Sequence, residues 1–278
     1  MSDKKLLPVK SDIVFRMFFA DEKNIEFLTS FLKSVIQLPK DEFDKIEIAD
    51  PFLSPEYIGD KYAIIDVKLY TKSRKIIHVE IQLQITSEVK NRIVFYDAKL
   101  ITEQLGIGDK YHAIQKVISI VITDDDINKG SPRYHHKFKF YDSEAKVEFT
   151  DIIEIHTLEL KKLPITEDGT ELYDWSKFIA AENEEELNMV AERNPQVKKA
   201  VVTLKKLSAD EQARDMYERR EKALRDIDSR ERFAHEKGKE EERKIWQNVV
   251  ADKDAEITRL RSLIDAQNLL QKKVPPTI

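Results

Sequence analysis

Two acidic residues with the chemistry of a metal-binding pair lie in neighbouring runs of alternating apolar and polar residues. Asp66 and Lys68 belong to the first run, and Glu80 and Gln82 belong to the second. Such alternation is typical of β-strands, in which successive side chains point to opposite faces. Each carboxylate is therefore expected on a polar face, opposite a face of Ile, Val and Leu. Carboxylate oxygens are hard ligands of the kind that Mg²⁺ binds.

The connector around Ser73 predicts a hairpin between the two strands. A hairpin centred there places Asp66 opposite Glu80 and Lys68 opposite His78. Directly opposed side chains have Cβ atoms ~4.5 to 5.5 Å apart, and like charges at that spacing destabilise a sheet. Facing carboxylates therefore favour a bound cation, and Mg²⁺ combines one or two carboxylates with phosphate oxygens of a substrate. The alternative is the ordinary polar face of a half-exposed sheet, where Lys68 would be merely solubilising.

The elements that must position these strands follow the order α, β, β, β, α, β, with further strands after them. Residues 117–123, VISIVIT, form a continuous apolar run typical of a strand covered on both faces. This order predicts an α/β fold with a mixed sheet. The expected segments are a helix after Ser11, a helix after Asp21 or Asn24, strands at Phe43–Ile48, Tyr62–Tyr70 and Ile76–Ile85, a helix at Arg92–Gln104, the strand at 117–123, and strands at His136–Tyr141 and Lys146–Leu160.

The helix after the two acidic strands carries a polar stripe. Arg92, Tyr96 and Lys99 are spaced at i, i+4 and i+7, so they share one helix face that can touch a substrate backbone. An ordinary solvated face has the same pattern. The apolar residues expected to face inward are Ile93, Ala98, Ile101 and Leu105.

The ordered set of these pieces resembles the Rpn family of recombination-promoting nucleases and transposases, a branch of the PD-(D/E)XK nucleases. The resemblance covers residues 10 to about 163, more than half the chain. The matching pieces are KSDIVFRMFF, FLTSFLKSVI, AIIDVKL with Asp66, HVEIQLQ with Glu80 and Gln82, Arg92 with Tyr96, GDKYHAIQKVISIVI, and HTLELKKLP.

This resemblance implies a restriction-endonuclease-like αβββαβ core and a metal-dependent DNA endonuclease using Mg²⁺. Asp66 and Glu80 take the metal-binding positions, and Gln82 stands where many relatives carry a catalytic lysine. Neutral Gln82 can position water or a phosphate oxygen, whereas Lys68 can supply the missing positive charge. Asp12 matches an acidic position of the opening helix that reaches the metal; its alternative role is a helix N-terminal acid favoured by the dipole.

Composition excludes several other kinds of site. The chain has no cysteine, which excludes disulfides and thiolate zinc sites, and it contains no HExxH or GxxxxGKS pattern. Asp124, Asp125 and Asp126 are typical of a solvated loop, and the adjacent His135 and His136 project differently. The first residues lack the apolar stretch of a signal peptide, and no apolar run is long enough for a membrane span, so a cytoplasmic protein is expected.

A net charge of −5 opposes binding to DNA, although a local basic surface remains compatible with it. Two further interpretations therefore stay open. One is a nucleic-acid-binding module that retains the fold with weak catalysis, and the other is a protein that acts mainly through oligomerisation.

The C-terminal part predicts a long charged helix, because Lys206–Lys272 contains one glycine and no proline. The expected organisation is a nuclease-like domain at 1–165, a helical connecting region at 166–205 and a coiled-coil-like extension at 206–278. A short seam with steps of three and four residues, interrupted by Lys253, suggests a homodimer. A helix folded back on the domain and a disordered tail are the alternatives. The seam residues are Trp246, Val250, Ile257, Leu260 and Ile264.

Overall fold

The computed structural model describes residues 6–53, 63–83 and 86–271, with side chains described as far as 265. By its contacts the chain divides into two compact units, Met1–Glu218 and Arg219–Ile278. The first unit contains the sheet and every candidate site residue. The boundaries expected after residues 165 and 205 stay predictions.

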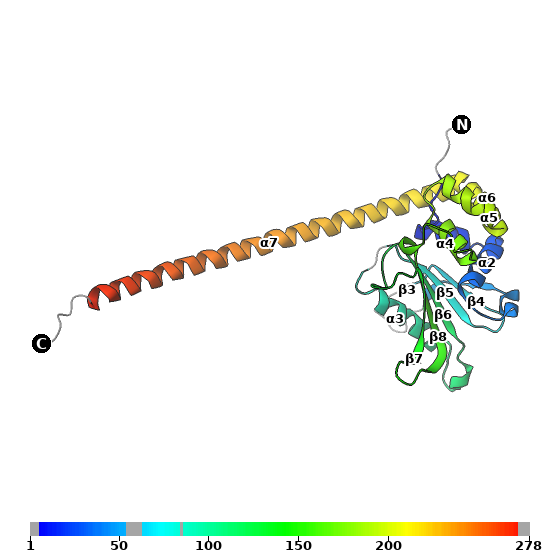
Figure 1. Ribbon diagram of the computed structural model, residues 1–278, viewed down its shortest axis with the longest axis horizontal. Coiled ribbons are helices and arrows are strands. Elements are labelled where there is room, and N and C mark those ends of the chain that lie inside the picture. Colours follow the sequence, from blue (N-terminus) through cyan, green and yellow to red (C-terminus); the bar gives the residue numbers. More distant parts are fainter. Residues whose placement is uncertain (1–5, 54–62, 84–85, 272–278) are drawn as a thin grey trace. The chain divides into compact units, whose positions relative to one another are not determined.

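A mixed six-stranded sheet forms the centre of the first unit, with the strand order β1-β4-β5-β6-β8-β7 (Figure 1). Strands β5, β6 and β8 run parallel, whereas β1, β4 and β7 are antiparallel to their neighbours. This arrangement confirms the predicted α/β class with a mixed sheet. The strands are β1 (Glu47–Ala49), β4 (Val67–Tyr70), β5 (Ile76–Ile81), β6 (Val117–Thr123), β7 (His135–Asp142) and β8 (Val147–Glu159).

Helices cover both faces of this sheet (Figure 1). The helices of the first unit are α1 (Asp12–Phe19), α2 (Ile25–Val35), α3 (Val89–Thr102), α4 (Glu171–Ala180), α5 (Glu184–Arg193) and α6 (Pro195–Ala209). The main core joins Phe18 of α1, Phe31 of α2 and Trp175 of α4 to one sheet face, where Val79 and Ile120 lie. Helix α3 packs on the opposite face. In β4 and β5 the alternation seen in the sequence therefore separates two buried faces, whereas β7 and the first half of β8 are largely exposed.

The hairpin between β4 and β5 has the predicted register, with Lys68 opposite His78. Its turn is closed by hydrogen bonds from Thr71 N–H to the Lys75 carbonyl (3.0 Å) and from Arg74 N–H to the Thr71 carbonyl (2.9 Å). Arg74 adopts a left-handed φ of 67° to make this turn.

The strand predicted at Phe43–Ile48 is wrong over its first half. A 3₁₀ helix occupies Lys40–Asp44, and β1 begins at Glu47. The side chain of Glu42 accepts hydrogen bonds from the Thr71 and Ser73 hydroxyls, both at 2.8 Å. This tertiary bond favours a turn there, although local propensity favours a strand.

The strand predicted at Tyr62–Tyr70 is interrupted. Ala63–Ile64 forms β3, which pairs with β2 (Phe52–Leu53) in a separate two-stranded sheet, and regular strand geometry resumes at Val67. Between them Ile65 N–H donates to the Pro51 carbonyl at 3.1 Å. Tyr62 lies outside the described residues, as do Gln84 and Ile85 at the end of the next expected strand.

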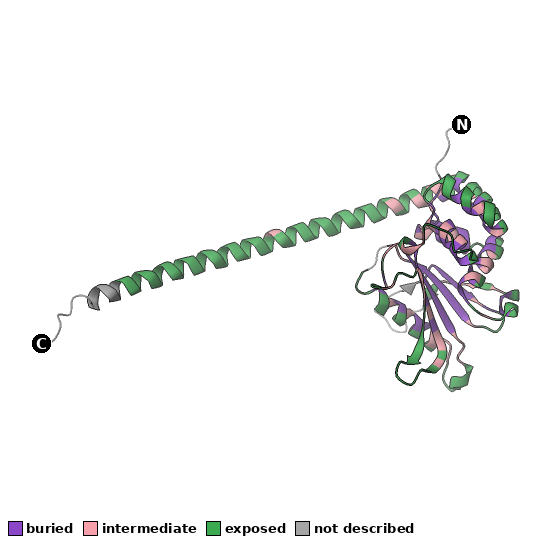
Figure 2. Cartoon of the chain, viewed as in Figure 1, coloured by how far each residue is buried: buried purple, intermediate pink, exposed green. Residues whose placement is uncertain are grey.

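Helix α7 (Glu211–Gln271) confirms the predicted helical extension, and its 61 residues begin in the first unit and continue through the second. Its start contributes Ala213 to the main core. In Figure 2 nearly all of the described remainder is coloured as exposed. Among the described residues no helix is both long and apolar enough to cross a bilayer. The cytoplasmic location stays a prediction.

Candidate active site

Asp66 and Glu80 lie together, and each is bound to the backbone beside the other. The N–H of Asp66 donates to Glu80 Oε1 at 3.2 Å, and the N–H of Ile81 donates to Asp66 Oδ2 at 2.8 Å. The break in strand geometry just before β4 frees the Asp66 backbone for this contact. The exposed position expected for these carboxylates is wrong, because Asp66 is 8% and Glu80 is 7% exposed.

Burial makes ionisation of this pair unfavourable. Burial raises the pKa of Asp66, with a further increase from Asp12, against the opposing effects of the Ile81 hydrogen bond and Arg16. Burial and the neighbouring Asp66 charge raise the pKa of Glu80. Two buried carboxylates repel each other when both are charged, and a cation between them would relieve that repulsion.

Helix α1 faces this pair with residues of both signs. Arg16 Nε lies 3.5 Å from Asp66 Oδ1. Asp12, one turn earlier, accepts from the N–H of Ile13 at 2.7 Å and lies near enough to raise the pKa of Asp66. The sequence interpretation missed Arg16, although its spacing of four residues from Asp12 is a usable signal.

Gln82 is paired with a cation from another element. The guanidinium of Arg92 in α3 donates to the side-chain oxygen of Gln82. The backbone N–H of Gln82 donates to the Ile122 carbonyl at 2.7 Å. Arg92 also counteracts the upward shift in the pKa of Glu80. An arginine therefore supplies positive charge beside Gln82.

Tyr96 belongs to the same group, and its ring centroid is 6.0 Å from the Arg92 guanidinium carbon. Burial and the nearby Glu80 charge raise the pKa of Tyr96. Arg92 and Tyr96 are partly exposed beside the carboxylates, as a contact with substrate requires.

Lys68 and Lys99 are buried in the structure. Both lysines are 8% exposed, which contradicts the solvated positions considered for them. Lys68 Nζ lies 3.8 Å from Glu103 Oε2. Their catalytic and substrate-binding roles stay predictions.

A second polar cluster fixes α3 to the strands. Asp97 Oδ1 lies 2.8 Å from His78 Nε2, and the Ser119 hydroxyl reaches both residues. All three side chains are fully buried. Asp97 thus occupies the inward position expected for Ala98, which is exposed. The cluster excludes substrate and positions the helix that carries Arg92.

The weaker sequence signals have local roles in the structure. Asp124 lies 3.5 Å from Lys10 Nζ, and Asp126 lies 2.6 Å from Lys162 Nζ, as solvated loop residues do. The rings of His135 and His136 diverge, because His135 contacts His156 at 2.9 Å while His136 contacts Ser131 at 2.6 Å.

The donor set fits a magnesium ion. In the described ranges no cluster of three or more His, Cys, Asp or Glu side chains could hold a metal. Mg²⁺ needs only one or two protein carboxylates when water and substrate phosphate complete its shell. Asp66 and Glu80 offer that number of hard oxygen ligands, held by backbone N–H groups.

Comparison with known proteins identifies the family of the chain. The sequence model of the family described as PD-(D/E)XK nuclease family transposase matches residues 9–232. No curated protein and no solved structure matches the chain. The family match includes α1, the acidic pair, α3 and the helices α4 to α6, and it ends within α7. The chain therefore belongs to the PD-(D/E)XK nuclease family transposases.

Proposed function

We propose that this nuclease-family protein is a Mg²⁺-dependent DNA endonuclease, with Asp66 and Glu80 as its metal ligands. The observation that carries the proposal is the buried carboxylate pair, in which each acid accepts a backbone N–H from the other strand region. When bound, Mg²⁺ makes water more acidic and neutralises phosphate charge. Asp12, whose charge acts on Asp66, would contribute directly or through an intervening water.

The residues around the pair then orient the reaction. Gln82 holds a water or a phosphate oxygen, and Arg92 supplies positive charge as negative charge develops on the scissile phosphate. Arg16 holds Asp66 in place. Tyr96, which is partly exposed beside Arg92, would contact the DNA backbone, and the family's association with recombination makes DNA the expected substrate.

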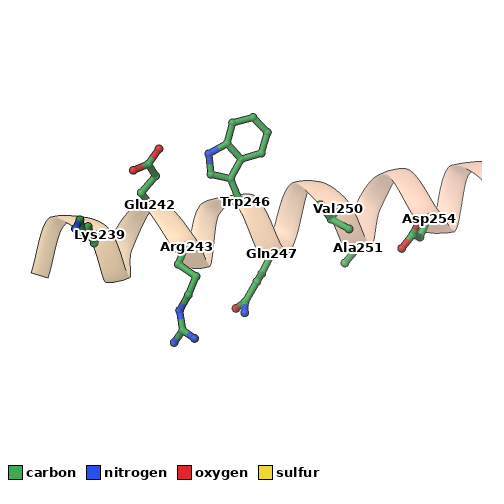
Figure 3. Close-up of a pocket in the computed structure, with 8 residues that line it drawn as sticks. All are labelled: Lys239, Glu242, Arg243, Trp246, Gln247, Val250, Ala251 and Asp254. Carbon is green, nitrogen blue, oxygen red and sulfur yellow. The ribbon is translucent and has the colours of Figure 1, made fainter. Parts of the chain in front are cut away.

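A second copy of the chain is the other proposed partner. The described part of α7 carries exposed Trp246, Val250, Ile257 and Leu260 at heptad spacing. Figure 3 shows Trp246 and Glu242 on one side of this helix and Arg243 on the other. Glu256 directly precedes the seam residue Ile257, and Arg261 directly follows the seam residue Leu260. In a parallel pair of α7 helices, Glu256 of one copy therefore faces Arg261 of the other, and the two charges are opposite.

An alternative is a DNA-binding module with little cleavage, which the neutral Gln82 at the lysine position favours. Nicking of supercoiled plasmid distinguishes the two functions. Wild type, Asp66→Asn and Gln82→Ala are compared with Mg²⁺ and with EDTA. Asp66→Asn is preferable to Asp66→Ala because the amide oxygen can still accept the Ile81 N–H.

Nicking that needs Mg²⁺ and is lost in Asp66→Asn is the expected result. A folded wild-type protein that binds plasmid without nicking it would replace the endonuclease assignment with the binding module. Retained nicking in Asp66→Asn would remove Asp66 from the site.

A further inference from the structure

A pocket lies next to the candidate active site, between the start of α3 and strand β7. Its volume is about 850 Å³, and its lining includes Lys90, the loop Asp125–Lys129, Arg133 and Phe138. Ile122, just before the loop, accepts the N–H of Gln82, and Lys90 lies two residues before Arg92. The segments that line the pocket therefore continue from those that carry Gln82 and Arg92, although neither of these two side chains lines it.

A buried acid, Glu159, fixes the loop that forms one wall of the pocket. Glu159 has a fully buried side chain and accepts from Asn128 Nδ2 at 2.7 Å and from Lys162 Nζ at 2.6 Å. Its Oε1 also lies 3.2 Å from His136 Nδ1. These contacts hold the loop and the His136 ring in one arrangement, so a ligand need not order them.

Three cations on the pocket rim are available to an anion. Lys90, Lys129 and Arg133 are exposed, and among the described residues none has a carboxylate within ion-pair distance. Asp125 and Asp126 also line the pocket and contribute opposing charges, and Asp126 lies 2.6 Å from the Lys162 ammonium. This arrangement supplies the local basic surface that the net charge of −5 conceals.

One wall of the pocket is aromatic. The rings of His136 and Phe138 are stacked, with centroids 6.0 Å apart and planes at 21°. Phe138 is 42% exposed and lines the pocket. In a duplex both faces of a base are covered by neighbouring bases, whereas an unpaired base has a free face for an aromatic ring.

We propose that this pocket binds an unpaired stretch of DNA beside the scissile phosphate, with the three cations on its phosphates and Phe138 stacked on a base. This inference rests on the proposed nuclease function, because that function supplies the cleaved phosphate beside the pocket. It predicts a preference for DNA with a single-stranded tail, flap or bubble over fully paired DNA.

The test measures binding by fluorescence anisotropy in the full-length Asp66→Asn protein, which keeps probes intact. The probes are a labelled blunt duplex and the same duplex with a single-stranded tail. The tailed probe is expected to bind more tightly, and Phe138→Ala to weaken its binding by about tenfold, as loss of one stacking contact does. Binding of the blunt duplex should change little.

Phe140→Ala is the matched control, because Phe140 is an exposed aromatic of the same strand that does not line the pocket. Combined Lys129→Ala and Arg133→Ala substitutions should reduce the salt dependence of binding to the tailed probe, whereas exposed Lys198→Ala on α6 should not. All substitutions replace exposed side chains, and thermal melting verifies their folding.

Equal binding of both probes, or equal effects of Phe138→Ala and Phe140→Ala, would overturn the pocket assignment and leave plasmid nicking unaffected. Conversely, a tail preference lost in Phe138→Ala together with no nicking by wild type would retain the pocket and reject the endonuclease. Failure of the pocket assignment and failure of the endonuclease proposal therefore give different results.

Discussion

Arg92 brings a positive charge to the acidic strands from α3, a separate helix. Its guanidinium contacts Gln82 and acts on Glu80 at the same time. A lysine on the strand would itself place a positive charge beside the carboxylates. Here the neutral amide of Gln82 occupies the strand position, and Arg92 of α3 supplies the positive charge.

Arg92→Ala is therefore expected to lower kcat for cleavage by about 10²-fold, the usual cost of removing one transition-state donor, with a smaller change in KM. Single-turnover cleavage measures this loss. Adding Gln82→Lys to Arg92→Ala should recover part of it, because the lysine restores positive charge at the strand. The proposal that Arg92 supplies this charge is wrong if Arg92→Ala cleaves at the wild-type rate, or if Gln82→Lys does not raise the cleavage rate of Arg92→Ala.

Glu42 links the hairpin turn to acid stability. Burial opposes its ionisation, but hydrogen bonds from Lys75, Ser73 and Thr71 prevail and lower its pKa from 4.5 to about 2. A lowered pKa stabilises the fold above pH 4.5, and this contribution is lost as pH falls towards 2.

We expect Glu42→Gln to remove about 1 to 3 kcal/mol of unfolding free energy at pH 6 and roughly half as much at pH 3, because a carboxyl group with a pKa of about 2 is still largely ionised there. Urea denaturation at both pH values checks this difference. Glu47→Gln serves as control, since Glu47 forms an exposed pair with Arg74. A pH-independent effect of Glu42→Gln would contradict the ionic role of Glu42.

At the residue scale, sequence alternation and the hairpin register predicted that Asp66 meets Glu80. They did not predict the burial of Lys68 and Lys99, because packing of α3 over the strands is a tertiary property. The same applies to Arg16, whose place beside Asp66 depends on how α1 meets the sheet.

At the scale of elements, α3 is attached to β5 and β6 through Asp97, His78 and Ser119. Removing the carboxylate leaves two fully buried polar groups without their shared partner. Asp97→Ala should therefore lower the free energy of unfolding by about 3 kcal/mol.

Chemical denaturation of Asp97→Ala measures that loss, with exposed Glu88→Gln at the start of α3 as control. Because the cluster also positions Arg92, cleavage by the variant should fall even at temperatures where it is folded. Unchanged stability would mean that α3 is held by its apolar contacts alone.

Element types were predictable wherever hydrophobic periodicity was long. The run VISIVIT became β6, and the polar-apolar alternation became β4 and β5. Prediction failed at Phe43–Ile48, where Glu42 binds a distant turn, and at Ile65, where the strand leaves its sheet. In both places a contact remote in sequence decided the backbone, and no local pattern encodes such a contact.

At the scale of the whole molecule, the sheet and α1 to α6 form a unit that ends at Glu218, and most of α7 belongs to a second. We expect the chain truncated after Glu218 to remain folded and monomeric, because the main core is complete within it. Full-length protein should sediment as a dimer if the α7 seam pairs.

Leu260→Lys places a charge in that seam and should shift full-length protein to monomer in analytical ultracentrifugation. Ala255→Lys lies on the opposite side of the heptad and should leave the dimer intact. A wild-type monomer at all concentrations would reject the α7 interface.

The reciprocal backbone contacts of Asp66 and Glu80 also bear on how this family can diverge. The side chains proposed to bind a metal also accept N–H groups of the fold, so under this proposal selection for catalysis and for folding acts on the same side chains. A descendant released from nuclease function should therefore drift to Asn or Gln at these positions before it accepts an apolar residue. Amide substitutions at both sites would thus be the evolutionary signature of a lineage that kept the scaffold and abandoned cleavage.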